Sequence, residues 1–207
     1  MTIRERRERE RAARRQLIID TARKLAEDDG WAAVTTRRLA DCIEYSQPVL
    51  YSHFTSMEAI VEAVAVQGFA DLADDLHTAC AGSETLDQRL GALATAYVEF
   101  GLSQPALYDA MFVQATDLAF GSAETPEQLR RAFDEMRSVI RESPGGIDPD
   151  ADTEVFWAAV HGLVTLARSH RLRIESTGVH LTVLLERVIR LWVPHPDRGA
   201  LNQWRDP

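Results

Sequence analysis

The sequence predicts an all-α protein made of a small three-helix head, with a helix-turn-helix, and a larger helical bundle. Apolar residues recur three or four positions apart in successive segments, which is the spacing of one helix face. Thr, Ser and Pro stand at several segment starts, where they cap a helix or occupy its first turn. With 207 residues and 45% apolar side chains, the chain can bury a sizeable core. We expect the head at residues 1–55 and the bundle at residues 56–207.

The N-terminal segment, residues 2–15, is rich in arginine and glutamate and has little apolar content. Two interpretations are open. The segment is either a basic arm that touches nucleic-acid phosphates or enters a minor groove, or a solvated helical extension with Glu/Arg pairs. Glu5, Glu8 and Glu10 dilute the positive charge and favour the solvated extension.

The first helix of the head follows this segment. Apolar residues between positions 17 and 25 repeat at helical spacing, and Gly30 is a ready C-terminal stop. Trp31 and Val34 are expected to pack over the end of this helix.

Residues 35–54 predict two short helices joined by a tight turn. Thr35 or Thr36 caps the first helix, and Ser46 caps the second, which has Pro48 in its first turn. The positions expected in the core are Leu39, Ile43, Leu50 and Phe54. The opposite face of the second helix carries Gln47, Pro48, Tyr51 and Ser52. A short helix with such a face suits the major groove of DNA.

The bundle begins with a long helix from Ser56, followed by helices from Thr85 to about Leu102 and from Pro105. A start signal at 125–128 predicts a helix that ends near Glu142, and residues 143–152 have the composition of a surface loop. The last two helices are expected at Thr153–Ser169 and Gly178–Trp192. Their apolar patterns are broader than one core needs, which indicates a partner. Residues after Pro194 are expected to form a loosely held tail.

Charge is unevenly distributed along the chain, whose formal net charge is -9. Residues 1–57 contain 11 Lys and Arg against 9 Asp and Glu, whereas the rest contains 12 against 23. The positive charge therefore gathers beside the two short helices. This arrangement is compatible with DNA binding, because only the surface near the phosphates gains from counterion release.

Several other classes of protein are not supported. No segment approaches the about 20 uninterrupted apolar residues of a membrane span, and the N-terminus has no apolar signal core, so we expect a soluble, cytoplasmic protein. Cys42 and Cys80 form no C-x-x-C pair and are expected to be free thiols. No arrangement at catalytic or metal-ligand spacing stands out, so no catalytic residue, metal or cofactor is predicted.

The pattern T-T-R-x-L-A, then a turn, then Q-P-x-L-Y-x-H-F before a long helix, resembles the DNA-binding domain of the TetR family of transcriptional regulators. The resemblance covers roughly residues 14–66. It implies a homodimer, most often a repressor, that binds a palindromic operator in double-stranded DNA. The residues it implies at the DNA are Thr36, Arg37, Ser46, Gln47, Pro48, Val49, Tyr51, Ser52 and His53.

The resemblance also implies distinct roles for these residues. Phosphate contacts fall to Thr36, Tyr51 and His53, and base contacts to Arg37, Gln47 and Pro48. The chemistry agrees, since arginine forks onto guanine, glutamine onto adenine, and proline offers an apolar face to a thymine methyl. By the pattern of the sequence, Tyr51 could instead be partly core, and Arg38 is expected to be solvated.

Two positions depart from the family pattern. Glu44 stands in the turn where the family usually has glycine, so we expect a distorted or displaced turn, because glutamate disfavours positive φ. Met57 stands where lysine is common, so one phosphate contact is expected to be missing. These departures and the net acidity support an alternative, a helical dimerisation or adaptor protein that keeps the fold without sequence-specific DNA binding.

The run F-W-A-A-V-H-G-L contains a Trp-x-x-x-His-Gly signature that resembles the ligand-binding domain of one TetR subgroup. The side chains expected to converge on a pocket for a small apolar or amphipathic effector are Tyr97, Phe100, Tyr108, Met111, Phe112, Phe133, Met136, Trp157 and His161. Ordinary core packing is the other interpretation of these residues. In the family, the last two helices form a four-helix dimer interface with their symmetry mates.

Overall fold

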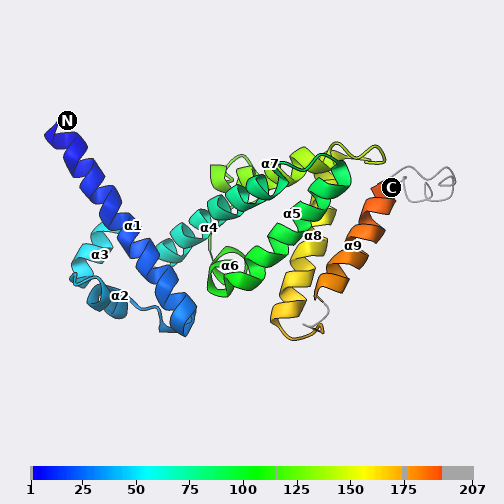
Figure 1. The fold of residues 1–207 in the computed structure, drawn as a ribbon. Coiled ribbons are helices and arrows are strands. Elements are labelled where there is room, and N and C mark those ends of the chain that lie inside the picture. The colour runs from blue at the N-terminus through cyan, green and yellow to red at the C-terminus, as the bar shows by residue number, and fades with distance from the viewer. Residues whose placement is uncertain (1, 115, 174–176, 193–207) are drawn as a thin grey trace, which may run out of the picture. The chain divides into compact units, whose positions relative to one another are not determined.

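The structure is a computed structural model, and it describes residues 2–114, 116–173 and 177–192 (Figure 1). Within these ranges every regular element is a helix, which confirms the predicted all-α class. The chain divides into two compact units. The first comprises the residues up to Leu72 together with Ser103–Arg131, and the second comprises Ala73–Leu102 together with the residues from Ala132 onward. A functional boundary between residues 55 and 56 stays a prediction.

The first unit contains α1 (Ile3–Asp29), a 3-10 turn (Trp31–Ala33), α2 (Thr36–Cys42), α3 (Gln47–His53), the start of α4 (Met57–Cys80) and α6 (Pro105–Phe112). Its core includes the four positions expected in the head, which are Leu39, Ile43, Leu50 and Phe54. The apolar residues on one side of this part of α4 are buried as well, namely Ile60, Val61, Val64, Phe69 and Leu72. Burial of these stripes holds the short helices, which would be marginal alone.

Helix α1 begins much earlier than its apolar repeat. Thr2 accepts a hydrogen bond from the backbone N–H of Glu5 at 3.2 Å, and the Glu5 carboxylate accepts one from the Thr2 N–H at 2.8 Å. This capping box starts the helix at Ile3, and Gly30, with φ of 80°, ends it. The N-terminal segment is therefore helical, in agreement with the extension interpretation.

Helix α6 is fastened to α1 by polar contacts within the first unit. The Trp31 indole N–H donates to the Ala106 carbonyl at 2.7 Å, and the Leu107 N–H donates to the Glu27 carboxylate at 3.1 Å. On α4, a Cβ atom added at Gly68 would lie 2.7 Å from the Met111 sulfur. Glycine at this position therefore allows α4 and α6 to approach closely.

The second unit is built mainly from α5 (Leu86–Ser103), α7 (Glu127–Ile140), α8 (Pro149–Arg168) and α9 (Thr177–Trp192). Helix α8 begins four residues before the predicted start, because Asp148 caps it by accepting hydrogen bonds from Asp150 and Ala151 at 2.8 and 3.2 Å. The predicted loop at 143–152 is thus too long at its C-terminal end.

Two further sequence expectations concern the thiols and membrane spans. Cys42 is exposed, Cys80 is half-buried, and both are free, as predicted. Among the described residues, no helix combines the length and apolar character needed to cross a membrane. The predicted loose tail after Pro194 lies outside the described residues.

Candidate functional site

The turn between α2 and α3 has a regular backbone conformation although Glu44 stands where glycine is usual. Glu44 has φ of 57°, the left-handed region usually left to glycine. The Tyr45 N–H reaches the Ala40 carbonyl at 2.9 Å and the Glu44 N–H reaches the Asp41 carbonyl at 3.4 Å, which is the Schellman pattern of helix C-termini. The expectation of a distorted or displaced turn is therefore wrong. Glu44 adopts the left-handed backbone conformation that glycine usually adopts, and this conformation is strained for a glutamate.

The two arginines of α2, Arg37 and Arg38, lie in different environments. Thr35 caps the helix by accepting from the Arg38 N–H at 3.2 Å, as one of the predicted caps. Arg37 is exposed, whereas the Arg38 guanidinium forms an ion pair with Asp29 at the end of α1. The expectation that Arg38 is merely solvated is wrong, because the neighbouring helix end supplies a carboxylate. Thr36, at the first position of α2, is half-buried.

Helix α3 separates a buried side from a solvent side. Leu50 is 1% exposed, whereas Gln47, Pro48, Val49 and Ser52 are exposed and Tyr51 is 51% exposed. Tyr51 is thus not part of the core. The predicted polar face of α3 is therefore available to a partner.

The cap of α3 differs from the prediction. Ser46 occupies the N-cap position with extended backbone, but its hydroxyl makes no capping hydrogen bond. The Ser46 carbonyl instead accepts from the Val49 N–H at 3.0 Å, and Pro48 removes one donor from the first turn. The Ser46 side chain is exposed beside the other residues of this face.

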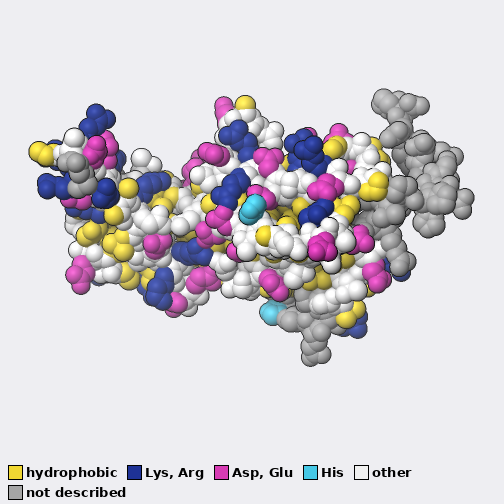
Figure 2. All heavy atoms as spheres, turned by 45° about the horizontal axis from the view of Figure 1, so that its top comes forward, with side chains coloured by type: hydrophobic (Ala, Val, Ile, Leu, Met, Phe, Trp, Pro, Cys, Tyr) yellow, Lys and Arg dark blue, Asp and Glu magenta, His cyan; other side chains and the backbone are white. Residues whose placement is uncertain are grey.

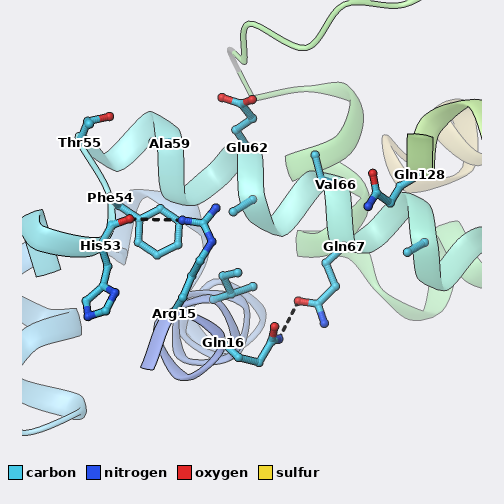
Figure 3. Close-up of a pocket in the computed structure, with 13 residues that line it drawn as sticks. Arg15, Gln16, His53, Phe54, Thr55, Ala59, Glu62, Val66, Gln67 and Gln128 are labelled. Carbon is cyan, nitrogen blue, oxygen red and sulfur yellow. Dashed lines mark hydrogen bonds between the residues drawn. The ribbon is translucent and has the colours of Figure 1, made fainter. Parts of the chain in front are cut away.

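The end of α3 lies against α1. The Arg15 guanidinium donates to the His53 carbonyl at 3.2 Å and lies 4.1 Å from the centre of the Phe54 ring (Figure 3). Burial, followed by the charges of Arg11, Arg14 and Arg15, lowers the pKa of His53. The His53 imidazole is therefore neutral near pH 7 in the free protein, and a phosphate beside it would favour the protonated form.

A surface groove of about 600 Å³ opens beside this contact, between α1, the residues that follow α3, and α4. Gln16 and Gln67 bridge α1 and α4 along it through a 3.0 Å hydrogen bond, as Figure 3 shows. The sequence pattern predicts neither the role of Arg15 nor this groove, because partners 38 and 51 positions apart leave no local pattern.

A second polar cluster lies inside the second unit. The Trp157 indole N–H donates to the Tyr97 hydroxyl at 2.8 Å, and the same hydroxyl is 3.4 Å from His161 Nδ1. Tyr97 is fully buried, and burial lowers the pKa of His161. The cluster therefore joins a buried phenol on α5 to a half-buried indole and a half-buried imidazole on α8.

The remaining residues predicted for a ligand pocket fall into both units. Phe100, Phe133 and Met136 belong to the second unit with the polar cluster. Tyr108, Met111 and Phe112 belong to the first, where the Tyr108 and Phe112 rings lie 4.6 Å apart and Met111 packs against Gly68. A single pocket formed by all nine residues stays a prediction.

The faces of α8 and α9 carry exposed apolar side chains. Val155 and Leu166 on α8 are 61% and 39% exposed, and Val179 and Val183 on α9 are 61% and 51% exposed. Each pair has the spacing of one helix face. Large apolar groups left on one face of a helix indicate a surface that a partner covers.

Two family models match the chain over these same regions. Residues 18–64 match the bacterial regulatory proteins of the tetR family, and residues 90–191 match the tetracyclin repressor-like C-terminal domain. The chain belongs to the TetR family of transcriptional regulators. It is thus a helix-turn-helix regulator from a family that is not enzymatic.

Relatives and solved structures agree with this assignment. An uncharacterised HTH-type transcriptional regulator of Mycobacterium tuberculosis is 29% identical over 80% of this chain and 71% of its own length. Another, of Bacillus subtilis, is 28% identical over 49% of this chain, and the match spans about half of that relative, 53%. A protein of unknown function from Rhodococcus sp. RHA1 superposes with a TM-score of 0.73 at 26% identity, covering 85% of this chain and 93% of its own.

Two more distant structures share the fold and contain ligands. A TetR variant from Acinetobacter baumannii in complex with minocycline has a TM-score of 0.61 at 19% identity and covers 84% of this chain and 92% of its own. FadR from Bacillus subtilis in complex with stearoyl-CoA has a TM-score of 0.60 at 13% identity and covers 86% of this chain and 97% of its own.

Proposed function

We propose that this TetR-family regulator is a homodimeric repressor that binds a palindromic operator and releases it when a small apolar or amphipathic ligand binds the helical bundle. The observation that carries the proposal is the solvent face of α3, where Gln47, Pro48, Val49 and Tyr51 are exposed above the buried Leu50. Such a protein acts in the cytoplasm, on chromosomal DNA.

The chemistry of this face suits base and backbone recognition. Gln47 can pair with adenine N6 and N7, and the exposed Arg37 on α2 can fork onto guanine. Tyr51, Ser52 and Ser46 carry hydroxyls that can bind phosphates, although the Ser52 hydroxyl donates to the Val49 carbonyl at 2.7 Å in the free protein. The apolar surfaces of Pro48 and Val49 suit a thymine methyl.

Dimerisation is supported by the apolar faces of α8 and α9. Two copies joined through Thr153–Ser169 and Gly178–Trp192 would cover Val155 and Val183 at a two-fold axis. A two-fold dimer presents two α3 helices to a palindrome whose half-sites lie one DNA turn apart, about 34–36 Å. Dimer affinity then adds to the modest affinity of each half-site contact.

The effector proposal rests on the polar cluster of the second unit and on the ligands of the distant relatives. Tyr97, Trp157 and His161 place hydrogen-bonding groups beside the buried, mostly apolar side chains of α5 and α8, which is the usual composition of a small-molecule site. Minocycline and stearoyl-CoA occupy two proteins of this fold, and we extend only the class, a small molecule with apolar surface. The ligand must bind the DNA-released state more tightly than the DNA-bound state, because equal affinity shifts nothing.

The test is selection of the full-length protein's preferred duplex from random sequence, followed by footprinting. We expect a two-fold protected site, and we expect Gln47→Ala and Tyr51→Ala to weaken binding by roughly ten-fold or more, as loss of a specific contact does. Val113→Ala is the control, because Val113 is 67% exposed and follows α6, outside the helix-turn-helix. Normal binding by both α3 variants would contradict the proposal.

The alternative, an adaptor that keeps the fold without reading DNA, makes the opposite prediction. Net acidity and Met57 support it, whereas the regular turn at Glu44 removes one of its arguments. No preference for any duplex over random sequence at low salt would favour the adaptor.

A further inference from the structure

The N-terminal half of α1 lies outside the segment that matches the family. The family match begins at residue 18, whereas α1 begins at Ile3. Every side chain from residue 3 to residue 17 is exposed, and Figure 1 shows this half of the helix extending past α2 and α3. Exposure throughout residues 3–17 means that burial in a core does not explain the sequence of this half of α1.

The three glutamates of this extension are engaged by local partners. Glu8 pairs with Arg4 at 2.9 Å and Glu10 pairs with Arg6 at 3.7 Å. The Glu5 carboxylate closes the capping box. These glutamates lower the net positive charge of the segment, but each of them is already bonded to a partner nearby in the chain.

A row of arginines is left without such partners. Within the described residues, no ion pair involves Arg7, Arg11 or Arg14. These residues are four and three positions apart, so they share one face of α1 and span about 10 Å along it. We call Arg7, Arg11 and Arg14 the arginine row.

The arginine row continues to the C-terminal end of α3, the helix proposed to read DNA. Arg11 and Arg14 act electrostatically on His53, the last residue of α3, together with Arg15, which donates to its carbonyl. Figure 2 shows several Lys and Arg side chains at the end of the molecule that carries the N-terminus, with Asp or Glu side chains between them. The positive surface thus runs from the end of α3 outward along α1.

We propose that Arg7, Arg11 and Arg14 form an auxiliary site for the DNA backbone, which binds phosphates flanking the bases read by α3. The inference rests on the proposed DNA binding of α3 and adds a surface that the family match does not include. Duplex DNA carries one negative charge per about 1.7 Å of its axis, so a row of about 10 Å meets several phosphates. Arginine suits them, because its guanidinium forms paired hydrogen bonds with phosphate oxygens.

The test compares two triple variants of the full-length protein that remove the same charge. Arg7→Gln, Arg11→Gln and Arg14→Gln remove the row, and Lys24→Gln, Arg130→Gln and Arg141→Gln remove three exposed cations outside the N-terminal half of α1. Binding is measured against salt concentration, both to the selected operator and to a random-sequence duplex of about 40 base pairs. The slope of log K against log salt should fall by about 0.9 for each phosphate that the row variant no longer neutralises, and clearly less in the control.

Hydroxyl-radical footprinting on the operator adds a positional readout. Protection should extend beyond each half-site for the wild type and the control and shrink for the row variant. Equal slopes and equal footprints for the two variants would overturn the inference. So would a row variant that loses binding only to phosphatidylserine vesicles, because the row would then serve a membrane surface.

The failure of the proposed function is separately visible. If no operator is selected, that proposal fails, while the random-sequence duplex still decides whether the row binds DNA backbone. Helix content by circular dichroism should be equal in the wild type and both variants, because all six altered side chains are exposed. A change in slope then reports on DNA contact.

Discussion

The α3 face and the Tyr97 cluster place polar groups in opposite environments. On α3, Gln47 and Tyr51 are exposed and rest on the buried Leu50, whereas in the second unit Tyr97 is buried and hydrogen-bonded to Trp157. On α3, the groups proposed to contact DNA are exposed to water, and the helix that carries them is anchored by the buried Leu50. A small ligand in the proposed pocket would meet the Tyr97 hydroxyl, which is already removed from water. Removal from water strengthens a hydrogen bond and raises the cost of breaking it.

The strongest test of this contrast separates the two sides of α3. Leu50→Ala should destabilise the protein by about 2–5 kcal/mol, because it removes a fully buried side chain from the core of the head. Tyr51→Ala, one position along, should change stability by less than about 0.5 kcal/mol while weakening DNA binding. Urea unfolding and operator titration of both variants provide the measurements. A large stability loss in Tyr51→Ala would show that the two sides of α3 are not separate.

A second prediction addresses the buried cluster. Tyr97→Phe keeps the ring but removes the hydroxyl that accepts from Trp157, and should destabilise the protein by about 1 kcal/mol. Tyr45→Phe is a matched control on a half-exposed tyrosine and should be nearly neutral. Thermal unfolding and Trp fluorescence follow the change. Equal stability of the two variants would contradict a cluster held together by its hydrogen bonds.

A third prediction compares one motif that occurs in both units. Glu44 ends α2 with φ of 57°, and His170 ends α8 with φ of 54°, where the Arg171 N–H meets the Leu166 carbonyl at 2.9 Å. Glu44→Gly should stabilise the protein by roughly 0.5–1 kcal/mol, the relief of left-handed strain less the entropy of glycine. His170→Gly should act similarly, whereas Glu44→Ala should bring no gain. Urea unfolding measures all three, and destabilisation by both glycine variants would show that the turns are unstrained.

The sequence predicts the α3 face because the relevant pattern is local. Leu50 and Phe54 are four apart and fall on one face of the helix, whereas the polar positions fall on the opposite face. The Asp148 cap is not predicted, because the glycine-rich, proline-rich composition of residues 143–152 outweighs one start signal. Arg15 against Phe54, and Arg38 against Asp29, depend on how helices meet, and no sequence spacing encodes those contacts.

The division of the nine predicted pocket residues has a similar cause. Tyr97 and Tyr108 are close in sequence and both are buried, yet they belong to different units because the chain leaves one unit between them. Helical periodicity identifies buried positions without saying which core they enter. The sequence pattern selects both Trp157 and Tyr97, but it does not predict the hydrogen bond between them.

The smallest expected effect is the pH dependence that the His161 imidazole adds to the stability of the protein. Burial lowers the pKa of His161 in the folded protein, so the unfolded chain binds the proton more readily. At pH values above the ordinary histidine pKa near 6.5, His161 therefore does not reduce the free energy of unfolding. As the pH drops from that value toward the lowered pKa of the folded state, the free energy of unfolding falls. Unfolding measured between pH 7.5 and about 5 should show a shallower decline in His161→Gln than in the wild type. Identical profiles for the wild type and His161→Gln would mean that the imidazole is solvated, and the contrast between the two environments would then rest on Tyr97 alone.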